Sequence, residues 1–223
     1  MIKAVIFDFD GTLTPLSLDF KLLREEIANI ARRYTTEEII KETEDNFIIE
    51  MIHRIEDRLN GAREAAEFQK EAFDRLKVLE LESAIGKDVY PYTRDVLKNL
   101  KLIGIKTGII TRTTIDVVRR VFIDMDNYIS VTVTREDTRH VKPDPFHAFE
   151  ALRMLDALPG ESMMVGDHPT DVLAGMGAGM ITVGVLTGRT KREEFKKIGA
   201  TFILNDIRDI LNLKVIIQTK QFS

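Results

Sequence analysis

The sequence predicts an α/β protein with a doubly wound, Rossmann-like parallel sheet and an inserted α-helical domain. Between about residues 86 and 213, short and continuously apolar runs alternate with amphipathic segments, a pattern typical of a parallel sheet covered by helices on both faces. Another apolar run, residues 3–8, opens the chain, and a long helical stretch separates it from the rest. We therefore expect a core of residues 1–15 and 86–223 and an inserted domain of residues 16–85.

The inserted segment is expected to form a helical hairpin or bundle. It contains neither glycine nor proline from Leu16 to Asn60, and apolar residues recur at i, i+3, i+4 and i+7 from about residue 17 to 84. Thr36 followed by acidic residues indicates a helix start. Gly61 separates the last two helical stretches.

The remaining elements alternate in type. Strands after the first are predicted at residues 105–111, 128–134, 162–166, 180–185 and 200–204. Helices are predicted at residues 92–102, 115–124, 145–155, 170–177, 191–198 and 206–211. The tail, residues 214–223, could add an edge strand or extend loosely from the domain.

Composition excludes several classes of protein. The 223 residues include 44% hydrophobic residues and no cysteine, and the formal net charge is -4. Without cysteine, a disulfide scaffold and a thiolate metal site are excluded, and the mild acidity argues against a nucleic-acid binder. No apolar run is long enough to cross a membrane and no signal peptide is evident, so we expect a soluble cytoplasmic protein, monomeric or homodimeric.

The first strand poses an electrostatic problem. It ends in Asp8 and Asp10, and residues i and i+2 of a strand face the same side. Two carboxylates about 4 Å apart repel by roughly 4 kcal/mol at an effective dielectric constant near 20. Either one of them holds a proton or a positive group lies beside them.

The carboxyl ends of the other strands suggest what that positive group is. Ligands of open α/β sheets bind at this edge, and here the predicted strands are followed by Thr111 and Arg112, by Lys142, and by Asp167 and Asp171. Four aspartates and one lysine would carry excess negative charge. A hard divalent cation resolves that excess, and Mg²⁺ is the usual ion beside a phosphate.

These residues form a pattern that resembles a known family. The DFDGTLT run after the first strand, Thr111 after the second, Lys142 in KPDP and the GDHPTD run after a later strand are similar, in order and spacing, to the four motifs of haloacid dehalogenase-like (HAD) hydrolases. The insert resembles the helical cap of that family, and the subgroup resembled is that of phosphoglycolate phosphatases and β-phosphoglucomutases. The resemblance implies a Mg²⁺-dependent phosphatase that acts on a small phosphorylated metabolite, with no nucleic-acid or membrane partner.

The resemblance also implies residue roles. Asp8 would be the nucleophile that forms an aspartyl-phosphate, and Asp10 the general acid and then the general base. Lys142 would neutralise charge on the nucleophile and on the transferring group. Asp8, the carbonyl of Asp10 and Asp167 would bind the metal, and Asp171 would orient metal-bound water or Lys142.

Phosphate would be bound by the backbone N–H groups of Gly11 and Thr12, the hydroxyl of Thr111 and the N–H of Arg112. The family often has Asn after the Ser or Thr of the second motif, whereas this chain has Arg112. The backbone contact survives this change, and the side chain could meet either substrate or solvent. In the insert, the arginines that could meet an anionic substrate are Arg32, Arg33, Arg54, Arg58 and Arg63.

Other functions use the same residues differently. A phosphomutase shares all four motifs and differs in whether the aspartyl-phosphate reacts with water or with a sugar hydroxyl. A 2-haloacid dehalogenase is disfavoured because it lacks an aspartate at the position of Asp10. A non-catalytic binding module would be expected to lose one of the acidic residues or Lys142, and all are present. An EF-hand is disfavoured because Gly11 and Asp19 occupy the wrong loop positions.

Overall fold

The computed structural model describes residues 1–214 and 216, and these form two compact units. One unit comprises Met1–Ser17 together with the chain from Gly86 onward, and the other comprises Leu18–Ile85. The tail for which an edge strand was considered lies almost entirely outside the described residues. No helix among the described residues is long and apolar enough to cross a membrane.

The first unit contains one sheet of six parallel strands in the order β3-β2-β1-β4-β5-β6. Its strands are β1 (Ala4–Phe7), β2 (Lys106–Ile110), β3 (Val131–Val133), β4 (Ser162–Gly166), β5 (Ile181–Val185) and β6 (Phe202–Leu204). The two central strands, β1 and β4, consist entirely of buried residues, as expected when helices cover both faces. The predicted doubly wound α/β fold is confirmed.

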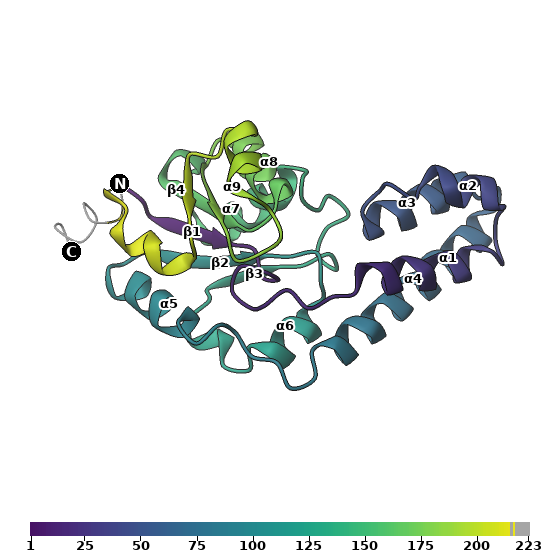
Figure 1. Ribbon diagram of the computed structural model, residues 1–223, viewed down its shortest axis with the longest axis horizontal. Helices are drawn as coiled ribbons and strands as arrows, with labels where there is room; N and C mark the ends of the chain where they lie inside the picture. The colour runs from purple at the N-terminus through teal and green to yellow at the C-terminus, as the bar shows by residue number, and fades with distance from the viewer. Residues whose placement is uncertain (215, 217–223) are drawn as a thin grey trace. The chain divides into compact units, whose positions relative to one another are not determined.

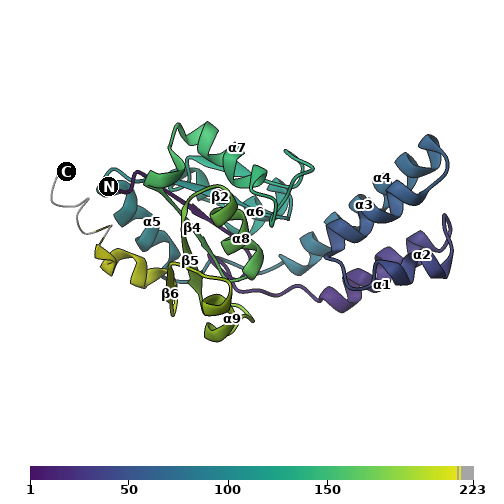
Figure 2. The same ribbon diagram turned by 90° about the horizontal axis from the view of Figure 1, so that it is seen from above.

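Helices cover the sheet from both sides. They are α5 (Thr93–Leu102), α6 (Ile115–Val121), α7 (Phe146–Leu155), α8 (Pro169–Gly177) and α9 (Arg192–Lys197), with short 3₁₀ helices η1 (Met125–Asn127), η2 (Pro159–Glu161) and η3 (Ile207–Asn212). In Figure 1, α7, α8 and α9 lie over one face and α5 over the other. Figure 2 shows α7, α8 and α9 side by side across the sheet. Small residues of α7, Ala148 and Ala151, pack closely on Ile6 and Met164.

Two predicted elements differ most from those observed, while α6 ends at Val121 instead of residue 124 and β6 begins at Phe202 instead of residue 200. The strand expected at residues 128–134 is only β3, because the backbone N–H groups of Tyr128 and Ile129 bond to the carbonyl of Met125 in a tight turn. At its other end, the Asp137 carboxylate accepts hydrogen bonds from the N–H and hydroxyl of Thr134 and starts a loop. The last helix, predicted at residues 206–211, is the 3₁₀ helix η3.

The second unit is a group of helices with its own core. It consists of α1 (Phe20–Ala31), α2 (Glu37–Glu42), α3 (Ile48–Arg58) and α4 (Ala62–Ser83). Long α4 packs against both α1 and α3. Ile27, Ile52, Ile55 and Phe68 are fully buried among them, so the helical periodicity of the insert corresponds to a real apolar core.

Candidate active site

The candidate site lies where the strand order of the sheet reverses. Strand β1 pairs with β2 on one side and with β4 on the other, and doubly wound sheets bind ligands at the carboxyl ends of strands at such a point. Phe7 of β1 is paired with Val165 of β4, and the Asp8 N–H donates to the Val165 carbonyl at 2.8 Å. This pairing brings the residues that follow the two strands together.

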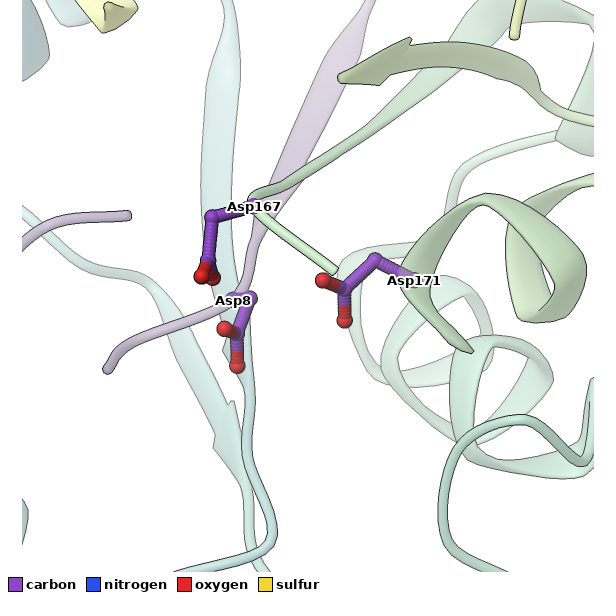
Figure 3. Close-up of side chains that lie close together, drawn as sticks. All are labelled: Asp8, Asp167 and Asp171. Carbon is purple, nitrogen blue, oxygen red and sulfur yellow. The ribbon is translucent and has the colours of Figure 1, made fainter. Parts of the chain in front are cut away.

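Three carboxylates gather there: Asp8 after β1, Asp167 after β4 and Asp171 in the first turn of α8 (Figure 3). All three side chains are buried, and one oxygen of each lies within 4.8 Å of the others. Within the described part of the chain, this is the one group of three or more His, Cys, Asp or Glu side chains close enough to share a metal ion. The structure therefore brings together three of the four predicted aspartates.

Lys142 is the positive charge of this group. Its side chain is 2% exposed, and its Nζ lies 2.5 Å from Asp8 Oδ1 and 2.6 Å from Asp171 Oδ1. Burial lowers the pKa of Lys142, but the neighbouring carboxylates of Asp171 and Asp8 outweigh burial and raise the pKa above its ordinary value. The lysine is therefore held as an ammonium that bridges two carboxylates.

One ammonium does not balance three carboxylates. Burial raises the pKa of Asp167, and the negative charges of Asp8 and Asp171 raise it further. Burial also raises the pKa of Asp171, in spite of the opposing effect of Lys142. A buried set of oxygen ligands with excess negative charge is the chemistry that a hard divalent cation such as Mg²⁺ requires, so these residues fit the metal that the sequence predicts.

Asp10 is not a member of this carboxylate group. Strand β1 ends at Phe7, and the carbonyl of Phe9 then accepts hydrogen bonds from Thr12, Leu13 and Thr14 in a turn. The alternation of a strand therefore does not continue to Asp10. Asp10 is instead near Lys87, whose pKa burial lowers and the charge of Asp10 partly restores.

The predicted phosphate-binding residues surround the same strand ends. Thr111 directly follows β2 and is buried, and its hydroxyl oxygen accepts a hydrogen bond from the Thr113 N–H at 3.2 Å. Arg112 is half-buried. The Gly11 N–H donates to the Thr14 carbonyl at 2.8 Å, and the Thr12 hydroxyl donates to Asp167 Oδ1 at 3.1 Å. In this structure Gly11 and Thr12 thus shape the loop and the acidic group.

His147 was not predicted as part of the site. It is fully buried, its Nδ1 accepts a hydrogen bond from the Lys142 N–H at 3.2 Å, and its Nε2 lies 3.1 Å from the Val133 carbonyl. The ring therefore fits the neutral tautomer with hydrogen on Nε2. Burial, aided by the charge of Lys142, lowers the pKa of His147 to about 4. The sequence gives little indication that His147 belongs to the site, because no other histidine lies at a metal-binding spacing from it.

The arginines of the helical unit are engaged in ion pairs within that unit. The pairs are Arg32–Glu37, Arg33–Glu71, Arg54–Glu50, Arg58–Glu42 and Arg63–Glu67. All five arginine side chains are largely exposed. Each candidate for substrate binding in the insert thus already has a carboxylate partner.

Known proteins resemble most of this chain in sequence. Residues 2–179 match the model of the family described as haloacid dehalogenase-like hydrolase. A relative from Bacillus mycoides, named pyrophosphatase PpaX, is 31% identical over 222 residues that cover 94% of this chain and 95% of the relative.

Solved structures share the fold. A crystal structure of a HAD hydrolase of family IA, variant 3, from Entamoeba histolytica has a TM-score of 0.71 at 17% identity and covers 98% of this chain and 100% of its own. A β-phosphoglucomutase from Clostridium difficile has a TM-score of 0.68 at 19% identity and covers 100% of this chain and 98% of its own. The resemblance drawn from the four motifs is confirmed.

Proposed function

Because the chain belongs to the haloacid dehalogenase-like hydrolases, we propose that it is a Mg²⁺-dependent phosphatase that hydrolyses a small phosphomonoester through an aspartyl-phosphate. The observation that carries this proposal is the buried Asp8 carboxylate, held by Lys142 beside Asp167 and Asp171 at the strand ends. A carboxylate fixed in this way can serve as a nucleophile. Phosphoryl transfer otherwise requires mainly positioning and neutralisation of charge.

The first half of the reaction transfers the phosphoryl group to the enzyme. An oxygen of Asp8 attacks phosphorus, the bond from phosphorus to the ester oxygen breaks, and Asp10 gives a proton to the departing oxygen. Lys142 offsets negative charge on Asp8 and on the phosphoryl oxygens. The position of Asp10, outside the acidic group, is compatible with a proton donor that faces the leaving group rather than the metal.

The second half releases phosphate. Asp10, now ionised, accepts a proton from a water molecule, which attacks the phosphorus of the aspartyl-phosphate and breaks its bond to Asp8. The Thr111 hydroxyl and the N–H groups of Gly11, Thr12 and Arg112 would donate to phosphate oxygens. For Gly11 and Thr12 this requires exchange of their present hydrogen bonds, to the carbonyls of Thr14 and Phe9 respectively.

Asp8, Asp167 and the Asp10 carbonyl would hold Mg²⁺, and Asp171 would support them through Lys142. Bound there, Mg²⁺ would neutralise charge on the transferring phosphoryl group. The helical unit, Leu18–Ile85 in the structure, is proposed as a cap that excludes water and selects the substrate. A net charge of -4 and the absence of cysteine support a cytoplasmic enzyme that acts on small metabolites rather than on nucleic acid or membranes.

The experiment is p-nitrophenyl phosphate hydrolysis with Mg²⁺, with EDTA and in the Asp8→Asn variant. Turnover that needs Mg²⁺ and disappears in Asp8→Asn supports the proposal. The matched control is Asp126→Asn, because Asp126 is an exposed aspartate paired with Arg119 on the surface. This variant is expected to keep full activity. Activity that survives in Asp8→Asn would contradict the role of Asp8.

A substrate panel then follows. Pyrophosphate is included because the Bacillus relatives are named pyrophosphatases, along with phosphoglycolate and sugar phosphates. If p-nitrophenyl phosphate is not hydrolysed, sugar 1-phosphates with a bisphosphate primer test for a phosphomutase. Product analysis separates the two reactions, because hydrolysis releases inorganic phosphate and a mutase returns an isomeric sugar phosphate.

A further inference from the structure

The loop that follows β5 contacts the loop that follows β1. Its Thr187 hydroxyl donates a hydrogen bond to the Gly11 carbonyl at 2.5 Å. The loop is also tied to the outer strand, because the Leu186 N–H donates to the Leu204 carbonyl at 3.0 Å. A second loop at this edge of the sheet is thus fixed to the loop that carries Asp10.

The same loop approaches the Asp167 carboxylate. A Cβ atom placed on Gly188 would lie 1.8 Å from Asp167 Oδ2 and 2.6 Å from its Cγ. A Cβ on Gly11 would lie 2.4 Å from the same Oδ2. Two separate backbone segments therefore contact this carboxylate more closely than any side chain would allow.

Gly188 differs from other glycines near β5 in what crowds it, which is the Asp167 carboxylate. Gly184, on β5 itself, is also crowded, but its Cβ would meet the ring of Phe195 at 2.6 Å, in the packing between the sheet and α9. Gly160, in contrast, has open space around it. Gly188, Gly184 and Gly160 therefore allow a comparison of a glycine crowded by the candidate metal ligand, one crowded by core packing and one that is not crowded.

We propose that Thr187 and Gly188 are positioning residues for the divalent-cation site. Gly188 leaves the space in which the Asp167 carboxylate lies, and Thr187 ties that loop to Gly11, which borders the same carboxylate. The Thr12 hydroxyl fixes the other oxygen, Oδ1. This proposal rests on the proposed metal site and extends it to the carboxyl end of β5.

The expected effect follows from geometry. A methyl group at residue 188 cannot coexist with Asp167 in its present position, so either the carboxylate or the loop must move. Changes in the groups that orient a metal ligand typically weaken metal affinity by about 10- to 100-fold. We expect Gly188→Ala to weaken cation binding by about tenfold or more.

The experiment measures metal binding without turnover. The full chain is titrated with Mn²⁺ while the paramagnetic resonance signal of the free ion is recorded, and Mg²⁺ is then added as a competitor. Gly188→Ala should bind Mn²⁺ about tenfold more weakly or worse, whereas Gly160→Ala should bind like the unsubstituted protein. Gly184→Ala should lower the melting temperature in EDTA and keep its Mn²⁺ affinity.

Each outcome discriminates. If the unsubstituted protein binds neither ion, the proposed metal site itself fails. If it binds and Gly188→Ala binds equally well, or if Gly184→Ala loses affinity to the same extent, the positioning role is overturned.

If Gly188→Ala does not fold, two variants of Thr187 test the proposal instead. Thr187→Val removes the donor to Gly11 and should weaken Mn²⁺ binding. Thr187→Ser retains the hydroxyl and should bind Mn²⁺ like the unsubstituted protein. Equal Mn²⁺ affinities of Thr187→Val and Thr187→Ser would overturn the proposal.

Discussion

Replacing His147 with glutamine should remove a specific part of the acid sensitivity of this protein. In the fold the pKa of His147 is lowered to about 4 because the ring is buried, whereas in the unfolded chain an ordinary histidine has a pKa of about 6.5. Between these values the unfolded chain binds a proton that the folded protein does not. The neutral ring therefore contributes stability above pH ~6.5 that is lost as the pH falls toward ~4.

The magnitude follows from the two pKa values. At pH 5.0, protonation of His147 in the unfolded chain lowers the free energy of unfolding by about 2 kcal/mol relative to pH 7.5, and below pH ~4 by about 3 kcal/mol. His147→Gln also changes hydrogen bonds to Lys142 and Val133, but that cost does not depend on pH in this range. The informative quantity is therefore the difference between the two proteins in the change of unfolding free energy with pH.

The assay is urea unfolding at pH 7.5 and 5.0 in EDTA for the unsubstituted protein, His147→Gln and His140→Gln. His140→Gln is the control for replacing a histidine, because His140 is exposed and contacts Asp144 on the surface. Between pH 7.5 and 5.0, the free energy of unfolding should fall by about 2 kcal/mol less in His147→Gln than in the unsubstituted protein. Equal slopes for all three proteins would refute the reasoning, because His147 would then not be a neutral buried group.

Three further predictions concern the acidic group. Lys142→Met should lower the free energy of unfolding in EDTA by roughly 3–5 kcal/mol, because removing one partner leaves buried carboxylates uncompensated. Urea unfolding measures this loss of stability, and a loss below about 1 kcal/mol would contradict the prediction. Thr12→Val should weaken Mn²⁺ binding about tenfold, because the donor to Asp167 is lost, while Thr12→Ser should not. Gly166→Ala should destabilise the protein by about 1–3 kcal/mol, because its Cβ would lie 2.2 Å from Asp171 Cγ; Gly160→Ala is the control, and equal melting temperatures would contradict the prediction.

The sheet could be predicted because its central strands are buried on both faces. Such strands appear in the sequence as continuous apolar runs, and β4 and β5 lie within a residue of their predicted bounds. The signal is weaker at the edge, where β3 pairs with one neighbour only. There the local hydrogen bonds of Met125 and Asp137 decide where the strand begins and ends, and hydrophobic pattern does not report them.

The chemistry of the site could be predicted more fully than its geometry. The rule that ligands bind at strand carboxyl ends brings Asp8, Lys142 and Asp167 together without a structure. It does not say which way each carboxylate points. The turn closed by the Phe9 carbonyl directs the chain away after β1, and the first turn of α8 places Asp171 against Lys142.

The carboxyl end of β5 shows a different limit. Gly188 lies in a loop after a strand, as Gly11 does, and a sequence does not distinguish a glycine needed for a turn from one needed for close approach. The Gly188 backbone does not require a left-handed conformation, in contrast to Gly11, whose φ is +88°. Only the position of the Asp167 carboxylate, 21 residues earlier in the sequence, explains why no side chain fits.

The neutral state of His147 bears on the charge of the whole site. Asp8, Asp167 and Asp171 face a single buried ammonium, that of Lys142, so negative charge remains in excess. A protonated His147 would add a second cation behind Lys142 and reduce that excess, whereas the neutral ring holds the Lys142 backbone by hydrogen bonds alone. The lysine is thus positioned without additional positive charge. With all three carboxylates ionised, as metal ligands must be, two negative charges would be left over beside Lys142, which is the charge that one divalent cation balances.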